Sequence, residues 1–434
     1  MQIDLHYGKT GLPLELPDEW DVTVFRKTAM PVLDDPQAAL QRAVREPIGG
    51  EPLSVAAARA RTACILICDV TRPVPNGTLL PILVRTLLAA GIAAEQITIL
   101  VATGFHRPNE GEELREVVGD DWVLATVPVC NHFARNDEDH RLLGVTQRGT
   151  PAKLDRRFVD ADLRIVVGLV EPHFMAGYSG GRKLITPGIA HADTIASVHS
   201  AAFLEHPCAA NCRLQGNPLH DTQLEIARMV GPVYAVNTVL DEARRISYLS
   251  YGELEASHQA AIEFLTPYAT FPIETTFSTV ITTGAGYPLD KTYYQTVKGI
   301  VSAHELLTPG GMLFIASECS EGLGSPEFIS AQEQLLRLGS EDFLAMIVAQ
   351  TRANIDEWQT EMLIKALHRG TLCLYSTGLT AEEQRLTGVT CVPSLADAVR
   401  QRVAATGNRR IAVIPEGPYL IPLALQAAQL AYGV

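Results

Sequence analysis

From about residue 60 onward, short β-branched runs alternate with amphipathic segments of helical length, and this alternation restricts the chain to few folds. Between the first two runs, Leu79–Ala90 carries an apolar stripe and is followed by Gly91, a common helix stop. Strands that alternate with helices form βα units on a parallel sheet. The sequence therefore predicts an α/β fold with mostly parallel sheets. The runs expected to be its strands are 63–68, 97–102, 163–169 and 233–236.

The pattern is interrupted near residue 270, where the stretch 267–272 begins and ends with proline. A second α/β series follows, with strands expected at 278–283, 312–316, 371–375 and 411–414 and a helix at 342–349. We therefore expect an N-terminal domain at 1–270, a C-terminal domain at 276–415 and a terminal helix at 420–434. The sequence leaves open whether that helix packs back on the first domain.

Composition excludes several classes of protein. Of 434 residues, 47% are apolar and 19% are charged, which is typical of an ordered globular chain. The net charge of −14 repels nucleic acid and anionic membranes. The chain shows no stretch of eighteen apolar residues and does not begin like a signal peptide. We expect a cytoplasmic protein with neither nucleic acid nor membrane as a partner.

The eight cysteines are scattered and form no CxxC pair, so they match neither a zinc ribbon nor a disulfide scaffold. Cys208 and Cys212 form a CxxxC, for which burial or a loop thiol is favoured over a metal or redox role.

Polar clusters follow several of the expected strands, where ligands bind in open α/β sheets. In Asp69–Pro75, two prolines stiffen the loop, so that Arg72 can present a planar fork to a carboxylate or phosphate, while Asp69 either accepts bonds from a sugar or fixes the arginine. A structural Asp–Arg pair explains the pattern equally well. In Thr103–Pro108, His106 is placed to act as a general base, although most loop histidines are simply solvated.

The richest cluster is Glu171–Gly188. Glycines at 177, 180 and 181 allow backbone N–H groups to approach an anion, and Arg182 and Lys183 add positive charge. The spacing matches neither a Walker A loop nor GxGxxG. Lys183 is either a counter-charge to a phosphate, which the spacing favours, or an amine for covalent chemistry.

Two further positions have weaker signals. His199 belongs to no three-ligand zinc pattern, and alone it is expected to be an ordinary histidine. Lys298 follows Tyr294 and Gln295 near the start of an expected helix and could bind a substrate carboxylate, although such a lysine is usually a surface residue.

Together these motifs resemble the nickel-pincer lactate racemase family. The segments that show the resemblance are DVTRPVP at 69–75, ATGFHRP at 102–108, EPHFMAGYSGGRKLITPG at 171–188, VHS at 198–200 and YYQTVK at 293–298. They occur in the family's order from about residue 60 to 300, and Trp358 stands where the family carries an active-site tryptophan.

The resemblance implies two α/β domains with the active site in the cleft between them. It implies a nickel-pincer nucleotide, pyridinium-3,5-bisthiocarboxylic acid mononucleotide nickel, linked covalently to Lys183, with His199 as the protein ligand to nickel. A three-donor organic group leaves one ligand of a square-planar ion for the protein to supply. The resemblance also implies that His106 and His173 are the acid/base histidines and that Arg72 and Lys298 bind the substrate carboxylate. It implies that Tyr294, Gln295 and Trp358 line the substrate-binding part of the site. The implied cofactor contacts come from Asp69, Thr71, Ser179, Gly180 and Gly181.

The resemblance thus implies a racemase or epimerase that inverts C2 of a 2-hydroxy acid by reversible hydride transfer. Val70 stands where a histidine is common in the family, so the substrate can be lactate or a larger acid such as malate, an aryl lactate or an aldonate. The expected partners are this substrate, the cofactor-building enzymes transiently, and a second copy in a homo-oligomer. The alternatives are a non-redox nucleotide- or sugar-phosphate-binding module built on the 177–183 loop, and an NAD or zinc dehydrogenase, which the absent motifs disfavour.

Overall fold

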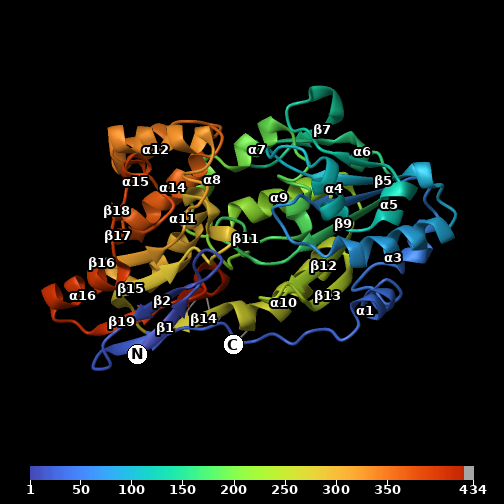
Figure 1. Cartoon of the computed structure of the whole chain (residues 1–434). Helices are drawn as coiled ribbons and strands as arrows, with labels where there is room; N and C mark the ends of the chain where they lie inside the picture. The colour runs from blue at the N-terminus through green and yellow to red at the C-terminus, as the bar shows by residue number, and fades with distance from the viewer. Residues whose placement is uncertain (425–434) are drawn as a thin grey trace. The chain divides into compact units, whose positions relative to one another are not determined.

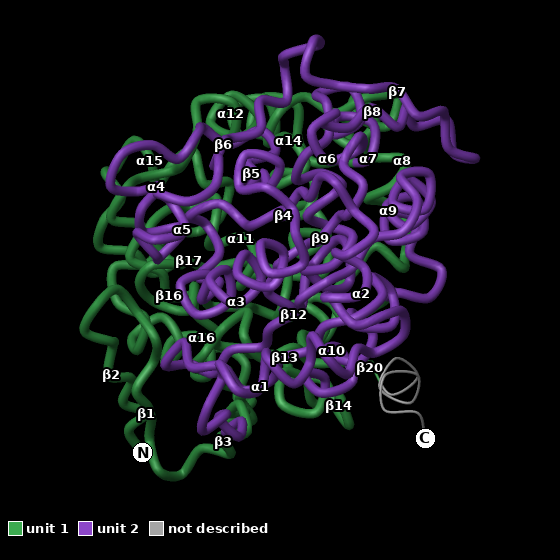
Figure 2. Tube along the Cα trace, turned by 90° about the vertical axis from the view of Figure 1, so that its right-hand side faces the viewer, with its two compact units in different colours: residues 1–28, 199–213, 267–434 green, residues 29–198, 214–266 purple. Residues whose placement is uncertain are grey.

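The computed structural model describes residues 1–424, which form two compact units (Figure 2). Unit 1 comprises Met1–Thr28, His199–Arg213 and the described chain from Pro267 to Ala424. Unit 2 comprises Ala29–Val198 and Leu214–Thr266. Among residues 1–424 no helix is long and apolar enough to cross a membrane.

Unit 2 is built on a six-stranded sheet with the order β13-β12-β9-β4-β5-β6. All neighbouring strands in it are parallel except β12 and β13. The strands of this sheet are β4 Ala63–Cys68, β5 Ile97–Ala102, β6 Val129–Asn131, β9 Leu163–Leu169, β12 Tyr234–Leu240 and β13 Ile246–Glu253. Unit 2 also contains two small hairpins, which are β7 His140–Val145 with β8 Pro151–Asp155 and β10 Pro172–His173 with β11 Gly177–Tyr178.

The central strand β4 is apolar along its whole length because both faces of the sheet are covered. Ile65 and Ile67 point into one hydrophobic core, and Cys64 and Leu66 point into the other. Figure 1 shows helices beside this sheet. The helices of unit 2 are α1 Pro36–Ala43, α2 Leu53–Ala57, α3 Asn76–Ala89, α4 Gly111–Val118, α5 Asp121–Thr126, α6 Arg156–Val159, α7 Ala192–Val198, α9 Pro218–Val230 and α10 Leu254–Ala269.

Unit 1 contains a second six-stranded sheet with the order β18-β17-β16-β15-β19-β3, in which every neighbouring pair is parallel. The strands of this sheet are β3 Asp21–Val24, β15 Phe277–Thr283, β16 Leu307–Ala316, β17 Gly370–Tyr375, β18 Thr390–Cys391 and β19 Arg410–Val413. Unit 1 also contains two separate strand pairs, which are β1 Gln2–Leu5 with β2 Leu12–Glu15 and β14 Thr270–Ile273 with β20 Ile421–Ala424. The helices are α8 Ala201–Leu204, α11 Tyr293–Ala303, α12 Pro326–Leu338, α13 Ser340–Val348, α14 Glu357–Leu367, α15 Ala381–Leu386 and α16 Leu395–Thr406. The two sheets confirm the predicted α/β class.

The division of the chain differs from the expected one. Residues 1–28 lie in unit 1 and not with the rest of 1–270, because β3 pairs with β19 and extends the second sheet. The expected terminal helix at 420–434 is wrong where the structure describes it: Ile421–Ala424 is the strand β20, whose backbone pairs in parallel with β14. Residues 425–434 lie outside the described part of the chain.

Leu5→Ala tests the assignment of the N-terminal segment to unit 1. Leu5 is buried in one core with Phe314 of β16 and Ile411 of β19. Its truncation should cost about 2–5 kcal/mol. Hydrogen exchange should show lost protection in β15, β16 and β19 and unchanged protection in β4 and β9. Asp4→Ala, at the exposed neighbouring position, should change stability by less than about 0.5 kcal/mol. Loss of protection confined to unit 2 would contradict the assignment.

Candidate active site

Three loops of unit 2 meet at one edge of its sheet. Strands β9, β4 and β5 are adjacent and parallel, so their carboxyl ends point the same way. The segments that follow them carry Asp69, His106 and Glu171. The sheet therefore gathers side chains that are up to 102 positions apart in the sequence (171 − 69).

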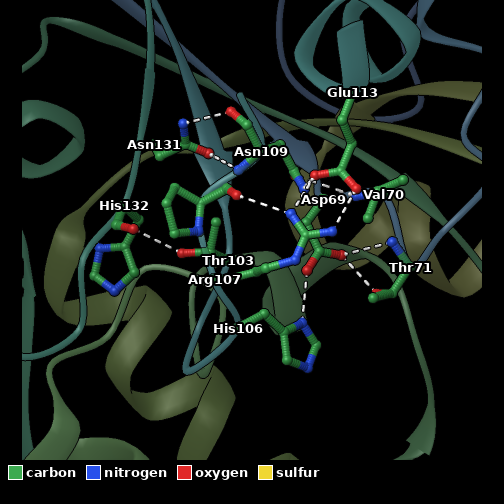
Figure 3. A network of polar contacts seen from close by, with 11 residues as sticks. Asp69, Val70, Thr71, Thr103, His106, Arg107, Asn109, Glu113, Asn131 and His132 are labelled. Carbon is green, nitrogen blue, oxygen red and sulfur yellow. Dashed lines mark hydrogen bonds and ion pairs between the residues drawn. The ribbon is translucent and has the colours of Figure 1, made fainter. Parts of the chain in front are cut away.

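Asp69 and His106 form a hydrogen-bonded pair (Figure 3). Asp69 Oδ2 lies 2.6 Å from His106 Nδ1, and Asp69 Oδ1 accepts bonds from Thr71 N at 3.2 Å and Thr71 Oγ1 at 2.5 Å. The carboxylate is only 5% exposed. Burial would raise its pKa, but the bonds from His106 and Thr71 outweigh burial and hold the pKa of Asp69 below its ordinary value. The side chain of His106 is 62% exposed, so its ring remains accessible.

A polar network behind this pair fixes the two loops (Figure 3). Asn109 Oδ1 accepts from Val70 N at 3.3 Å, and Asn109 Nδ2 donates to Glu113 at 2.8 Å. Asn109 and Asn131 exchange two further bonds, Asn109 N to Asn131 Oδ1 and Asn131 Nδ2 to Asn109 O, both at 2.9 Å. The backbone after β4 is thus tied to the segment after β5 and to the last residue of β6.

Arg72 is the third charged group at this edge. Its Nε lies 3.9 Å from Glu171 Oε2, and the two side chains are 28% and 32% exposed. The backbone N–H of Arg72 donates to Asp69 O at 3.1 Å. The guanidinium therefore lies beside a carboxylate with part of its surface open to solvent, which suits a group that binds an anionic ligand.

His173 and Lys183 are in direct contact. His173 Nε2 lies 2.9 Å from Lys183 Nζ. On the other side of the ring, Nδ1 accepts backbone N–H groups from Met175 at 3.3 Å and Ala176 at 3.2 Å. His173 ends β10, and Lys183 lies in the 3₁₀ turn Gly181–Leu184.

The glycines of this turn serve close packing. Gly180 has φ +77°, and a Cβ there would lie 2.8 Å from Val170 Cγ2. A Cβ on Gly181 would lie 3.0 Å from the ring of His258. Three backbone N–H groups already donate within the protein: Ser179 N to Glu171 O, Gly181 N to Asn237 Oδ1 and Lys183 N to Gly180 O. These bonds stabilise the turn itself and make it a weaker cradle for an anion than its glycine content indicated.

Arg182 differs from the sequence-based interpretation as a charge facing a ligand. Its side chain is 1% exposed and donates to Ala176 O at 2.7 Å and Tyr178 O at 3.3 Å. Its Nη1 also lies 3.4 Å from His258 Nδ1, and His258 Nε2 contacts Ser179 O at 2.7 Å. Arg182 and His258 together bind three carbonyl groups of the loop that carries His173.

Asn237 and His258 were not among the site residues expected from the sequence. Burial lowers the pKa of His258 to about 3, so this histidine is neutral and serves as a structural donor. The strand segment YAVNTVL contains one usable signal, because an asparagine in a buried apolar strand requires a specific hydrogen-bond partner. His258 has no comparable signal in the sequence.

Unit 1 contains a second group of the expected site residues. The ring of His199 lies 4.7 Å from that of Trp358 on α14, centroid to centroid. Trp358 Nε1 donates to the hydroxyl of Tyr294 on α11 at 3.3 Å, and Gln359 Nε2 donates to Tyr294 O at 2.5 Å. Burial raises the pKa of Tyr294, so its hydroxyl stays protonated. The imidazole of His199 thus lies against the indole ring of Trp358.

Helix α11 also carries Gln295 and Lys298. The helix begins where the sequence predicted, with Thr292 accepting a capping bond from Gln295 N. Gln295 Oε1 is buried and has no hydrogen-bond partner among the described residues, which is costly for a carbonyl oxygen. Lys298 is half-buried, one helical turn further along. Within residues 1–424 no three His, Cys, Asp or Glu side chains are arranged to hold a metal ion.

Comparison with known proteins gives consistent results. Residues 7–211 match the family model of the lactate racemase N-terminal domain, and residues 274–421 match that of the C-terminal domain. The chain is 31% identical to the lactate racemase of Thermoanaerobacterium thermosaccharolyticum over 96% of this chain and 98% of that protein. It is 29% identical to the lactate racemase of Lactiplantibacillus plantarum over the same shares.

Solved structures agree on the fold. The lactate racemase apoprotein from Thermoanaerobacterium thermosaccharolyticum superposes with a TM-score of 0.91 at 30% identity, covering 98% of this chain and all of that one. A Thermotoga maritima protein shares the fold with a TM-score of 0.62 at 17% identity, covering 86% of this chain and 97% of that one.

Gly180→Ala tests the packing role of the glycine turn. Gly149 is the matched control, because its φ of +83° is equally strained for alanine but nothing lies within 4 Å of its Cβ position. Gly149→Ala should cost about 1–2 kcal/mol for the backbone alone. Gly180→Ala should cost roughly 1–3 kcal/mol more, because Val170 must move. Urea unfolding measures the free energy of unfolding of both variants. Equal losses of stability would show that packing at Gly180 is not restrictive.

Proposed function

The chain belongs to the lactate racemase family and is therefore an isomerase, and we propose that it inverts C2 of a 2-hydroxy acid, with lactate as the first candidate. Two relatives named lactate racemase, aligned over 96% of the chain, support this substrate. The observation that carries the proposal is a pair of histidines in unit 2 whose ring nitrogens have opposite hydrogen-bonding roles.

The partners of each ring determine where its proton lies. His106 Nδ1 faces the carboxylate of Asp69 and carries hydrogen, so in the neutral ring Nε2 has a lone pair that can accept the proton of a substrate hydroxyl. His173 Nδ1 accepts two backbone N–H groups, so its hydrogen lies on Nε2 and can be donated. Inversion presents the hydroxyl group in two positions, so it needs one group that accepts a proton and one that donates a proton.

Arg72 and Lys298 suit the substrate carboxylate. The guanidinium of Arg72 offers a planar fork and the ammonium of Lys298 a compact charge, and each of these groups suits a carboxylate. Tyr294, Gln295 and Trp358 would line the substrate side. The unsatisfied buried oxygen of Gln295 fits a hydroxyl donor on the substrate.

We further propose that Lys183 holds a nickel-pincer nucleotide covalently and that His199 is the protein ligand to its nickel. When bound, this group supplies the reversible hydride acceptor that C2 inversion requires. The donor chemistry fits, because Lys183 is an amine beside an imidazole and His199 is one imidazole fixed against an indole ring. For the ribose and phosphate, Asp69, Thr71 and Ser179–Gly181 fit less directly, since many of their polar groups already bond within the protein. We assign them to shaping the pocket.

The runner-up function is a non-redox module that binds a nucleotide or sugar phosphate in the 177–183 loop. The internal bonds of Ser179, Gly181 and Lys183 weigh against it, because they occupy N–H groups that such a site would use.

The proposed function predicts racemisation by the chain coexpressed with cofactor-building enzymes. Enantiopure lactate should approach a racemic mixture, as read by chiral chromatography, and a panel from malate to gluconate would define the acid accepted best. Intact-mass analysis should show a nickel-containing adduct that Lys183→Ala lacks, whereas Lys153→Ala should retain it. An unmodified, inactive chain that binds nucleoside phosphates would instead support the runner-up.

Asp69→Asn should lower kcat by about 10²-fold with little change in KM, because the amide no longer fixes the proton of His106 on Nδ1. Thr71→Val, which removes another bond to the same carboxylate, should have a much smaller effect. The pKa of Asp69 lies below its ordinary value, so Asp69 is ionised throughout pH 5–8. The loss of kcat in Asp69→Asn should therefore be present throughout that range, and equal kcat values would contradict the role.

A further inference from the structure

The hydrogen bonds of His173 restrict where its protons can lie. The backbone N–H groups of Met175 and Ala176 both point at Nδ1, at 3.3 and 3.2 Å. A ring nitrogen that accepts two N–H groups offers a lone pair and has no room for a proton of its own. A neutral His173 therefore carries its hydrogen on Nε2.

This hydrogen requires an acceptor at Lys183. Nε2 lies 2.9 Å from Nζ, and an ammonium has three donors but no lone pair, so it cannot accept the Nε2 hydrogen. The contact is satisfied when Lys183 is the neutral amine. If Lys183 were protonated, Nε2 of His173 would have to carry no hydrogen, so that it could accept a bond from the ammonium. The ring hydrogen would then lie on Nδ1 and point at the backbone N–H groups of Met175 and Ala176.

The charges around the turn point the same way. The buried guanidinium of Arg182 adjoins Lys183 in sequence, and a positive charge close by disfavours a second one. His220, Asp221 and His258 also lie near the guanidinium of Arg182, and both histidines are neutral because burial lowers their pKa values.

We propose that His173 holds Lys183 as a neutral, nucleophilic amine in the apoprotein, which makes Lys183 the preferred site of acylation by acyl and thioacyl carbons near neutral pH. The inference rests on contacts within unit 2. Its link to catalysis rests on the proposed function, in which this amine receives the cofactor.

The proposed acylation is a condensation that needs no oxidant or reductant. A thiocarboxylic acid and the amine form one C–N bond and break one C–O bond. The oxygen leaves as water with two of the three protons that the thiol and amine groups carried, and a thioamide remains. The thioamide nitrogen is no longer a basic acceptor, so acylation releases the Nε2 hydrogen of His173 for a substrate. His173 would thus first hold the amine and afterwards serve as the proton donor.

Competitive acetylation of the full-length apoprotein tests this. Light acetic anhydride in trace amounts, applied from pH 6 to 11 and followed by complete heavy acetylation after unfolding, gives the acetylated fraction of each lysine by peptide mass spectrometry. The pH midpoint for each lysine does not depend on its accessibility. Lys153 is the internal reference, because it is similarly half-buried but its ammonium is paired with Asp193 at 2.9 Å, which raises its pKa.

The midpoint for Lys183 should lie about two or more pH units below that for Lys153. An ordinary lysine is neutral in only about one molecule per 10³ at pH 7.4, so Lys183 should dominate acetylation there. His173→Ala should return the midpoint toward that of Lys153. His206→Ala is the control, since His206 Nδ1 also accepts a backbone N–H, from Cys208 at 3.2 Å, but forms no hydrogen bond with a lysine among the described residues.

Equal midpoints for Lys183 and Lys153 would overturn the proposal, as would a low midpoint that survives His173→Ala. Unchanged midpoints at the other lysines of His173→Ala would show that this variant folds. The acetylation experiment does not measure racemisation. If the chain were inactive as a racemase and the midpoint for Lys183 were still low, the proposed function would be wrong and this inference would still hold.

Discussion

The parallel pairing of β9, β4 and β5 is the constraint on which the rest of unit 2 depends. Parallel strands leave their carboxyl ends at a common edge, and each crossover returns the chain to the opposite edge before the next strand begins. The segments after these strands therefore meet, although Asp69, His106 and His173 are widely separated in sequence. Both faces of β4 are buried, which makes the sheet rigid and gives the loops a fixed base.

On this base, short contacts give two chemically identical side chains different roles. A buried carboxylate fixes the hydrogen of His106 on Nδ1, whereas two backbone N–H groups keep Nδ1 of His173 free of hydrogen. The two rings consequently present opposite atoms at Nε2, one a lone pair and the other a hydrogen. In His173 that hydrogen faces an amine, which links the protonation state of Lys183 to the backbone of its own loop.

The polar interior around the glycine turn supports this arrangement. Arg182, His258 and Asn237 are buried, and they bind carbonyl and N–H groups of the loop while contributing no surface charge. A loop without regular secondary structure has backbone groups that need partners when it is buried, and these side chains provide them. The turn is therefore a packed element whose conformation is set by its neighbours, and its glycines are required because Val170 and His258 leave no room for a Cβ.

The sequence alone determined the fold class, the main strands of both sheets and the start of α11, because strand periodicity and capping are local properties of the chain. Its motifs also identified the family. The sequence did not determine that residues 1–28 complete the second sheet or that Ile421–Ala424 is a strand, since both depend on pairing with distant segments. Nor did it reveal that Asp69 binds His106, that Arg182 is internal or that Lys183 faces His173. Those contacts depend on which atoms of separate loops approach within about 3 Å, and only the tertiary structure sets such distances.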